Sequence, residues 1–250
     1  MNKLLTPSSL AAALTLALAS LGAPLAQAAD EPVPDNAVSF NAAVTSDYRY
    51  RGLSQTRMKP ALQGGADYTH NPSGAYAGVW ASTIKWTSDL GGDGDVEIDL
   101  YGGKRGEITK GITYDVGGLY YAYPSNGLNP NANTFELYGQ VGMGPAYIKY
   151  SHSTTNLFGT TDSKGSGYLD LGVNLEMATG LVLNLHVGRQ RVAHNDALSY
   201  NDAKIGLTKD FGVATVALAV ISANTDLYVS PVNGKDLGRS RAVLTVSKTF

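Results

Sequence analysis

Charged side chains recur in this sequence at every second position of segments whose intervening positions are apolar. In the segment 96–102, Glu97 and Asp99 alternate with three apolar residues. Side chains two residues apart project from the same face of a β-strand, so these carboxylates would share one polar surface. Such a surface can attract cations or form ion pairs, depending on how the strands are brought together.

Thirteen charged residues take such polar-face positions, with nine acids against four bases. They are the acids Asp47, Asp67, Glu97, Asp99, Asp115, Glu136, Asp170, Glu176 and Asp202 and the bases Arg49, Lys149, Lys204 and Arg241. All except Asp67 and Arg241 are candidate pore-lining residues if the polar faces enclose a channel. Rings of acidic side chains favour cations in a pore, so this excess predicts a mild cation selectivity.

The same charges could instead pair with one another and plug the interior, as they often do in small barrels. Arg49 lies close enough in sequence to Asp47 to form such a pair. The carboxylates of Glu97 and Asp99 would need a base on a neighbouring strand.

Catalytic motifs are absent from the sequence. Ser151 and Ser153 flank His152, but adjacent residues in a strand point to opposite faces and cannot form a nucleophile–base pair. No nucleophile elbow, metalloprotease histidine pair or phosphate-binding loop is present. His186, on a polar face, leaves open a triad assembled across strands. We expect neither enzymatic activity nor a cofactor.

Metal binding has little support. The chain contains no cysteine, which excludes disulfides and thiolate sites. The Gly-rich segment 89–95 holds three aspartates but lacks the terminal glutamate of a calcium-binding loop. An acidic turn is the better interpretation, and no metal site is predicted.

Twelve alternating segments form the framework that positions these residues. The clearest is 169–177, in which five apolar residues alternate with Asp170, Gly172, Asn174 and Glu176. Each segment approaches the length of a tilted transmembrane strand. The predicted strands, with ten and fourteen as bounds on their number, are 38–45, 61–69, 75–86, 96–102, 112–117, 135–141, 146–152, 169–177, 181–187, 202–208, 213–223 and 241–250.

Long and short connections alternate between these strands. The long ones are 51–59, 87–94, 124–133, 154–166, 193–200 and 224–238, and the short ones are 71–74, 106–111, 144–145, 178–180 and 210–212. Outer-membrane barrels have this arrangement, with short periplasmic turns and long external loops. We therefore predict an all-β, transmembrane, antiparallel up-and-down barrel with both ends of the chain on the periplasmic side.

The first 28 residues read as a cleaved signal peptide. Lys3 precedes an apolar run rich in Ala and Leu, and Ala26-Gln27-Ala28 supplies the small-residue cleavage pattern. Residues 29–36 would be a periplasmic lead-in and 37–250 the barrel. Without residues 1–28, 18 basic residues remain against 21 acidic ones, a balance that does not favour a nucleic-acid partner.

A soluble barrel is the alternative, with apolar residues inside and charges outside. Aromatic residues near strand ends favour lipid instead, because aromatic girdles mark membrane interfaces. The expected girdle residues are Tyr48, Tyr50, Tyr68, Trp80, Trp86, Tyr120 and Tyr123. The terminal Phe250 resembles the signal by which the barrel assembly machinery recognises its substrates. Lys248, Arg189 and Lys209 fall on apolar faces near strand ends, where they can reach an interface.

The first long connection, 51–59, carries Arg51, Arg57 and Lys59. As an external loop it could attract anions or the phosphates of lipopolysaccharide. An ordinary solvated loop is the simpler interpretation.

Four stretches resemble the TorF-like family of putative porins, a conserved bacterial outer-membrane family of unknown function. They are Thr-Ser-Asp-Tyr-Arg-Tyr-Arg-Gly-Leu-Ser-Gln-Thr at 45–56, Gly-Ala-Tyr-Ala-Gly-Val-Trp-Ala-Ser at 74–82, Glu-Ile-Asp-Leu-Tyr-Gly-Gly at 97–103 and Tyr-Asn-Asp-Ala-Lys-Ile-Gly at 200–206. The family often shows Tyr-Pro-Gly after its fifth strand, whereas this chain has Tyr123-Pro124-Ser125-Asn126-Gly127. The resemblance implies an outer-membrane location and a porin-like role without a named substrate.

The predicted function is an outer-membrane porin-like channel for passive diffusion of small polar solutes or ions. A closed structural or adhesive barrel working through its external loops is the alternative, and a barrel hydrolase is a third possibility. The expected partners are outer-membrane lipid and lipopolysaccharide, the assembly machinery through Phe250, and small solutes.

Overall fold

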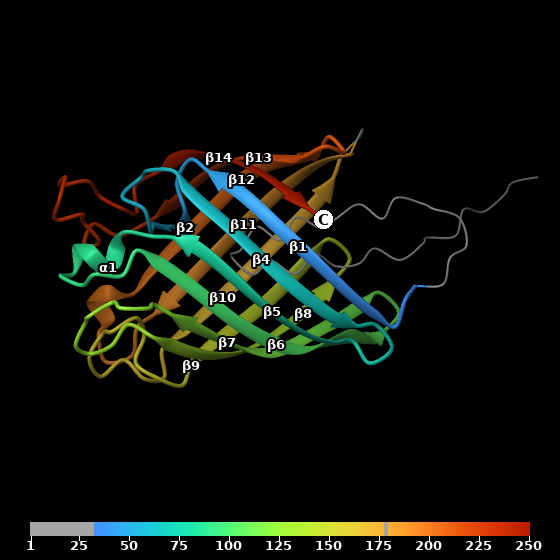
Figure 1. Ribbon diagram of the computed structural model, residues 1–250, viewed down its shortest axis with the longest axis horizontal. Helices are drawn as coiled ribbons and strands as arrows, with labels where there is room; N and C mark the ends of the chain where they lie inside the picture. The colour runs from blue at the N-terminus through green and yellow to red at the C-terminus, as the bar shows by residue number, and fades with distance from the viewer. Residues whose placement is uncertain (1–32, 178–179) are drawn as a thin grey trace, which may run out of the picture.

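A computed structural model describes residues 33–177 and 180–250 and shows a closed antiparallel barrel of twelve strands (Figure 1). The predicted fold class and strand number are confirmed. The expected signal peptide, 1–28, and the start of the lead-in lie outside the described residues. The barrel strands are β1 (Asn36–Thr45), β4 (Ala61–His70), β5 (Ala75–Thr83), β6 (Val96–Thr109), β7 (Ile112–Ala122), β8 (Thr134–Met143), β9 (Ala146–Ser153), β10 (Gly167–Glu176), β11 (Leu181–Arg191), β12 (Tyr200–Asp210), β13 (Thr215–Ala223) and β14 (Arg241–Thr249).

Three short elements lie outside the wall of the barrel. Strands β2 (Arg49–Tyr50) and β3 (Leu53–Ser54) pair in a separate two-stranded sheet. The helical turns are α1 (Trp86–Asp89) and η2 (Asp196–Leu198). In the described part of the chain, no helix has the length and apolar character needed to cross a membrane.

Each barrel strand pairs with its neighbours along the chain, and β1 closes the barrel by pairing with β14. The C-terminal residue takes part in this closure. The amide of Phe250 donates to the carbonyl of Phe40 over 2.8 Å, and the amide of Phe40 donates back over 3.1 Å. A closed barrel leaves no unpaired strand edge, as a bilayer requires.

Several strand boundaries differ from the expectation, among them the ends of β5 and β6. The segment 75–86 ends as a strand at Thr83, and Trp86 begins α1. The turn expected at 106–111 is shorter, because β6 continues to Thr109 with a register shift after Glu107. Gly111, at φ +82°, supplies the left-handed residue of this tight turn.

The long connections gather at one end of the barrel, on the left in Figure 1, and the short turns at the other. Outward-facing side chains along the strands are apolar and exposed: Leu169 and Leu171 are 38% and 41% exposed, whereas Asp170 between them is 8% exposed. This is the reverse of a soluble barrel and matches one that meets lipid.

The predicted aromatic girdle is largely wrong. Tyr48, Trp80 and Tyr123 are buried in a cluster inside the barrel, and Tyr50 and Trp86 pack against it. Trp80 pairs in register with the buried Asp99 and so belongs to the inward face of β5. The other four lie on connections, outside the strands of the wall, and these connections fold inward.

Two of the expected girdle residues do face outward. Tyr68 pairs in register with Val38, which is 63% exposed, and Tyr120 pairs with Leu100, which is 50% exposed. Both tyrosines lie within two residues of a strand end, so they keep the position expected of interfacial aromatics.

Candidate functional site

The interior of the barrel gathers most of the charged residues singled out from the sequence. A continuous row of paired residues runs across six strands, from β7 to β12. Its members are Asp115, Gln140, Lys149, Asp170, Gly188 and Asp202, each paired with the next. Because paired residues share a face of the sheet, the row places three acids and one base on the same inward surface.

The connection after β1 does not stay outside the barrel. Tyr50 pairs with Leu53 in a hairpin, β2–β3, and Arg51 and Gly52 form its two-residue tip. Both tip residues have positive φ, 45° and 82°, as the type I′ turn of a tight hairpin requires. Arg51 is only 6% exposed. The external loop expected at 51–59 is therefore wrong for this part, because the hairpin folds into the lumen.

The tip of the hairpin reaches the part of the wall that β12 and β13 form. A Cβ atom added to Gly52 would lie 2.5 Å from the Cβ of Asp202 on β12 and 3.0 Å from that of Ala223 on β13. The hairpin begins between β1 and β4, so it crosses the lumen at the loop end of the barrel. We name residues 46–60 the inserted loop.

Arg51 is held by residues of three strands. Its guanidinium donates to Glu136 on β8 over 2.6 Å and to Gln190 on β11 over 2.7 Å, and it lies 4.3 Å from the ring centre of Tyr168 on β10. Burial opposes its charge, but Glu136 beside it outweighs burial and raises the pKa of Arg51 well above its usual value. The hairpin tip therefore carries a permanent positive charge into the lumen.

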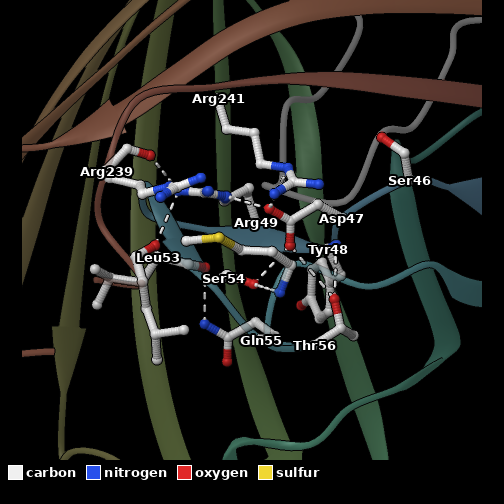
Figure 2. Close-up of polar contacts among 12 residues, drawn as sticks. Ser46, Asp47, Tyr48, Arg49, Leu53, Ser54, Gln55, Thr56, Arg239 and Arg241 are labelled. Atoms are coloured by element: carbon white, nitrogen blue, oxygen red, sulfur yellow. Dashed lines mark hydrogen bonds and ion pairs between the residues drawn. The ribbon is translucent and has the colours of Figure 1, made fainter. Parts of the chain in front are cut away.

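The base of the inserted loop is organised around Asp47 (Figure 2). Arg49 donates to its carboxylate over 2.7 Å and Ser54 over 2.6 Å, while Arg241 of β14 approaches to 4.0 Å. The ion pair expected between Asp47 and Arg49 is present. Arg49 also donates to the carbonyl of Leu237 over 2.9 Å, which ties the inserted loop to the last external connection.

Glu97 and Asp99 lie on the inward face of β6, both almost completely buried. The hydroxyl of Tyr48 donates to Glu97 over 2.7 Å, and Oδ1 of Asp99 has no hydrogen-bond partner among the described residues. Neither carboxylate forms an ion pair with any other described residue. The base expected on a neighbouring strand is therefore not found among them. Inward positions of the adjacent strands instead hold Trp80 and Tyr121.

His186 on β11 bridges two of the predicted acids. Its Nδ1 lies 2.8 Å from Asp170, and its Nε2 lies 2.7 Å from Asp202. The hydroxyl of Tyr168 donates to Asp202 over 2.9 Å, and the ring of the same tyrosine packs against the Arg51 guanidinium. Tyr168 therefore connects this cluster to Arg51. Both ring nitrogens of His186 are engaged by carboxylates, which leaves neither free to deprotonate a nucleophile.

A second cluster surrounds Asp115 on β7. Tyr76 donates to Asp115 over 2.6 Å and also contacts the hydroxyl of Tyr138. The ammonium group of Lys149 lies 4.2 Å from the ring centre of Tyr138. Lys149 is 6% exposed, so bulky aromatic side chains and charges fill this side of the interior together.

Four other predicted residues are not fully buried. Lys204 faces inward on β12 and is half-buried, and Asp67 accepts a hydrogen bond from Tyr101. Arg241 lies at the loop end near Asp47. Glu176 ends β10 at the turn side and is exposed, so it stands outside the buried network.

The acidic segment 89–95 forms ion pairs. Arg57 of the inserted loop contacts Asp89 over 2.6 Å, and Lys85 contacts Asp95 over 2.5 Å. The hydrogen bond from Lys85 lowers the pKa of Asp95. In the described residues, no group of three or more His, Asp or Glu side chains is arranged to hold a metal ion.

Sequence reasoning missed Arg51 as a lumen residue. The available signal was Tyr50-Arg51-Gly52-Leu53, in which a residue–glycine pair is flanked by apolar residues, as in a two-residue hairpin. With Arg51 included, the buried charged side chains of the described residues comprise seven acids and three bases. They are Asp47, Glu97, Asp99, Asp115, Glu136, Asp170 and Asp202 with Arg49, Arg51 and Lys149.

Residues 27–250 match the model of a family described as "Bacterial protein of unknown function (Gcw_chp)". This agrees with the expected membership of a bacterial family of unknown function, and the TorF-like name stays a prediction. No curated protein matches the sequence.

Solved porins share the fold. The structure titled "KdgM porin" has a TM-score of 0.53 at 4% identity and covers 85% of this chain and 97% of its own. One titled "NanC porin structure in rhombohedral crystal form" has a TM-score of 0.52 at 11% identity and covers 85% and 98%. A third, "KdgM porin in complex with disordered oligogalacturonate", has a TM-score of 0.52 at 4% identity, with coverage of 85% and 97%. At these identities the likeness concerns the fold alone.

Proposed function

This chain belongs to the Gcw_chp family of bacterial proteins of unknown function, and we propose that it is a porin-like channel for passive diffusion of small polar solutes or ions. The observation that carries the proposal is a closed barrel with an apolar exterior and a charged interior, crossed at the loop end by one inserted hairpin. A charged interior provides the polar lining that the passage of polar solutes requires.

The proposed solutes are cations and neutral polar molecules. Support comes from the excess of buried acids, seven against three bases in the described residues. One structural relative is titled as a complex with oligogalacturonate, which carries carboxylates. An acid-rich lumen would repel such a ligand, so the proposed selectivity is opposite in sign.

The inserted loop is proposed to act as the constriction. Its ion pairs and hydrogen bonds with Glu136, Gln190 and Leu237 hold it against the wall, so solutes would pass only beside it or after it moves. A charged constriction gates by both width and electrostatic potential.

The proposed location is the bacterial outer membrane. The apolar exterior and the likeness to porins support it. Assembly is proposed to use Phe250, which is 69% exposed and ends the closing strand pair, as the signal for the barrel assembly machinery. No catalytic step is assigned to the protein.

The test is conductance of the refolded mature protein in a planar bilayer with a potassium chloride gradient. Discrete steps with a reversal potential that favours cations are expected. A variant in which residues 46–60 are replaced by a two-residue turn is measured beside it. Silence from both proteins, each shown to be folded, would contradict the channel, and an anion-favouring potential would contradict the selectivity.

A closed barrel that works through its loops is the second candidate. The observation that favours it is the seal at the loop end, where the inserted loop contacts β12, β13 and the connection to β14. It predicts no conductance from the native protein, with conductance only after the inserted loop is removed.

A further inference from the structure

The outward face of the barrel carries an uneven distribution of charge. Strand positions that face outward hold five Lys and Arg residues, and none of the outward positions of the described strands holds Asp or Glu. The five are Lys104, Arg189, Arg191, Lys209 and Lys248. A basic exterior around an acidic interior is complementary to anionic lipid headgroups.

Only two of these bases lie at the loop end, and they are adjacent outward positions of one strand. Arg189 and Arg191 pair with Leu169 and Gly167 of β10, and both are exposed. Neither forms an ion pair with another described residue. Arg189 donates one hydrogen bond, to Asn201 on β12 over 3.3 Å, and a guanidinium has five donors. Donors therefore remain for a ligand outside the barrel.

A groove of about 400 Å³ adjoins Arg189 on the outward face of β10–β13. The row immediately on the turn side of Arg189 pairs Leu171, Val187, Ala203 and Ser222 across four strands. In this row, the bulky side chains of Leu171 and Val187 stand beside the small ones of Ala203 and Ser222. The small side chains leave a hollow, and they form its floor. An apolar floor thus lies deeper in the bilayer than a polar rim of Arg189, Asn201 and Asn224.

We propose that this groove is a binding site for a phosphorylated, acylated lipid of the outer leaflet, the lipid A class. An acyl chain would lie over Ala203 and Ser222, and a phosphate would accept hydrogen bonds from Arg189 and Arg191. Arginine forks match phosphate geometry, and the order of floor and rim along the membrane normal matches the order of chain and phosphate in such a lipid. The site is independent of transport through the lumen.

The experiment is native mass spectrometry of the folded mature protein in detergent, titrated with bisphosphorylated lipid A. The R189A/R191A variant should lose affinity by about tenfold or more, because two charge-assisted contacts are removed. The K209A/K248A variant is the matched control, with two outward bases removed at the opposite end, and should bind as the native protein does. A203L, which fills the floor from an exposed position, should also weaken binding.

Two outcomes would overturn the site. One is equal affinity of the native protein and R189A/R191A, with both shown to be folded by circular dichroism. The other is an equal loss in K209A/K248A, which would reduce the effect to general attraction between basic barrels and anionic lipid. Dephosphorylated lipid A should bind weakly and equally to the native protein, R189A/R191A and K209A/K248A. Equally tight binding of phosphatidylglycerol would contradict the lipid A class.

Discussion

The two sides of the barrel interior differ in the size of their side chains. Between β5 and β10 the inward positions hold large, buried residues such as Tyr76, Trp80 and Tyr138. On β12 and β13 the inward positions include Gly206, Ala217 and Ala219, and both alanines are half-buried. One side is therefore filled by its own strands, and the other is left with small residues.

The inserted loop fills only the loop end of the small-residue side. Its tip, Gly52, reaches the small-residue side at Asp202 and Ala223, so the hairpin occupies space that wall side chains leave free. Away from the loop end, nothing comparable in the described part of the chain covers Ala217 and Ala219. In the proposed channel, the solute path would follow the small-residue side, and the hairpin would close its outer end.

Removal of the inserted loop should have the largest effect on conductance, because it opens the small-residue side but not the crowded one. Thr45 already pairs with Ala61, so residues 46–60 can be replaced by an Asn-Gly turn that joins β1 directly to β4. Conductance in a planar bilayer should rise several-fold, because the obstruction is gone from the small-residue side. Unchanged conductance from a folded variant would show that the crowded side, not the hairpin, limits passage.

A large residue on the small-residue side should reverse part of that gain. In the variant without the inserted loop, Ala219→Trp should reduce conductance by less than the deletion increased it. Leu218→Trp is the matched control, because Leu218 precedes Ala219 on β13 but is 54% exposed to the outside. An equal reduction by the two tryptophans would place the path elsewhere.

Loss of the charge that holds the hairpin should destabilise the protein by about 3–5 kcal/mol, since removal of one partner leaves a buried charge uncompensated. The substitution is Glu136→Gln, which keeps the shape of the side chain but removes the negative charge opposite Arg51. The free energy of unfolding is measured by urea titration. The double variant R51M/E136L, with both charges replaced by apolar groups, should recover much of the loss. A double variant as unstable as Glu136→Gln would show that packing, not the unpaired charge, is responsible.

A methyl group at the hairpin tip should have the smallest effect, about 1–3 kcal/mol for a left-handed residue with a close contact. Gly52 and Gly111 share a φ of +82°, but only Gly52 has neighbours, whereas nothing lies within 4 Å of a Cβ at Gly111. Gly111→Ala therefore reports backbone strain alone, and Gly52→Ala adds the contact with Asp202. Equal free energies of unfolding for the two variants would mean that the tip does not press on the wall.

Much of the wall was predictable because the period of two is local. In β10, the alternation of Leu169, Asp170 and Leu171 already separates outward from inward residues, and the structure keeps that order. Turn residues and connection lengths placed the strand ends. The aromatic girdle failed where a residue's direction depended on the path of a connection, as for Tyr48 and Tyr123.

The sequence by itself determined the strand number, the two faces of each strand and the excess of acids inside, because these follow from residues a few positions apart. Only the tertiary structure decided which acids are compensated. Arg51 meets Glu136 across 85 positions, and Asp99 is left without a base among the described residues although its strand was correctly identified. Barrel closure and the inward path of one hairpin create these contacts, and neither leaves a periodic signal in the chain.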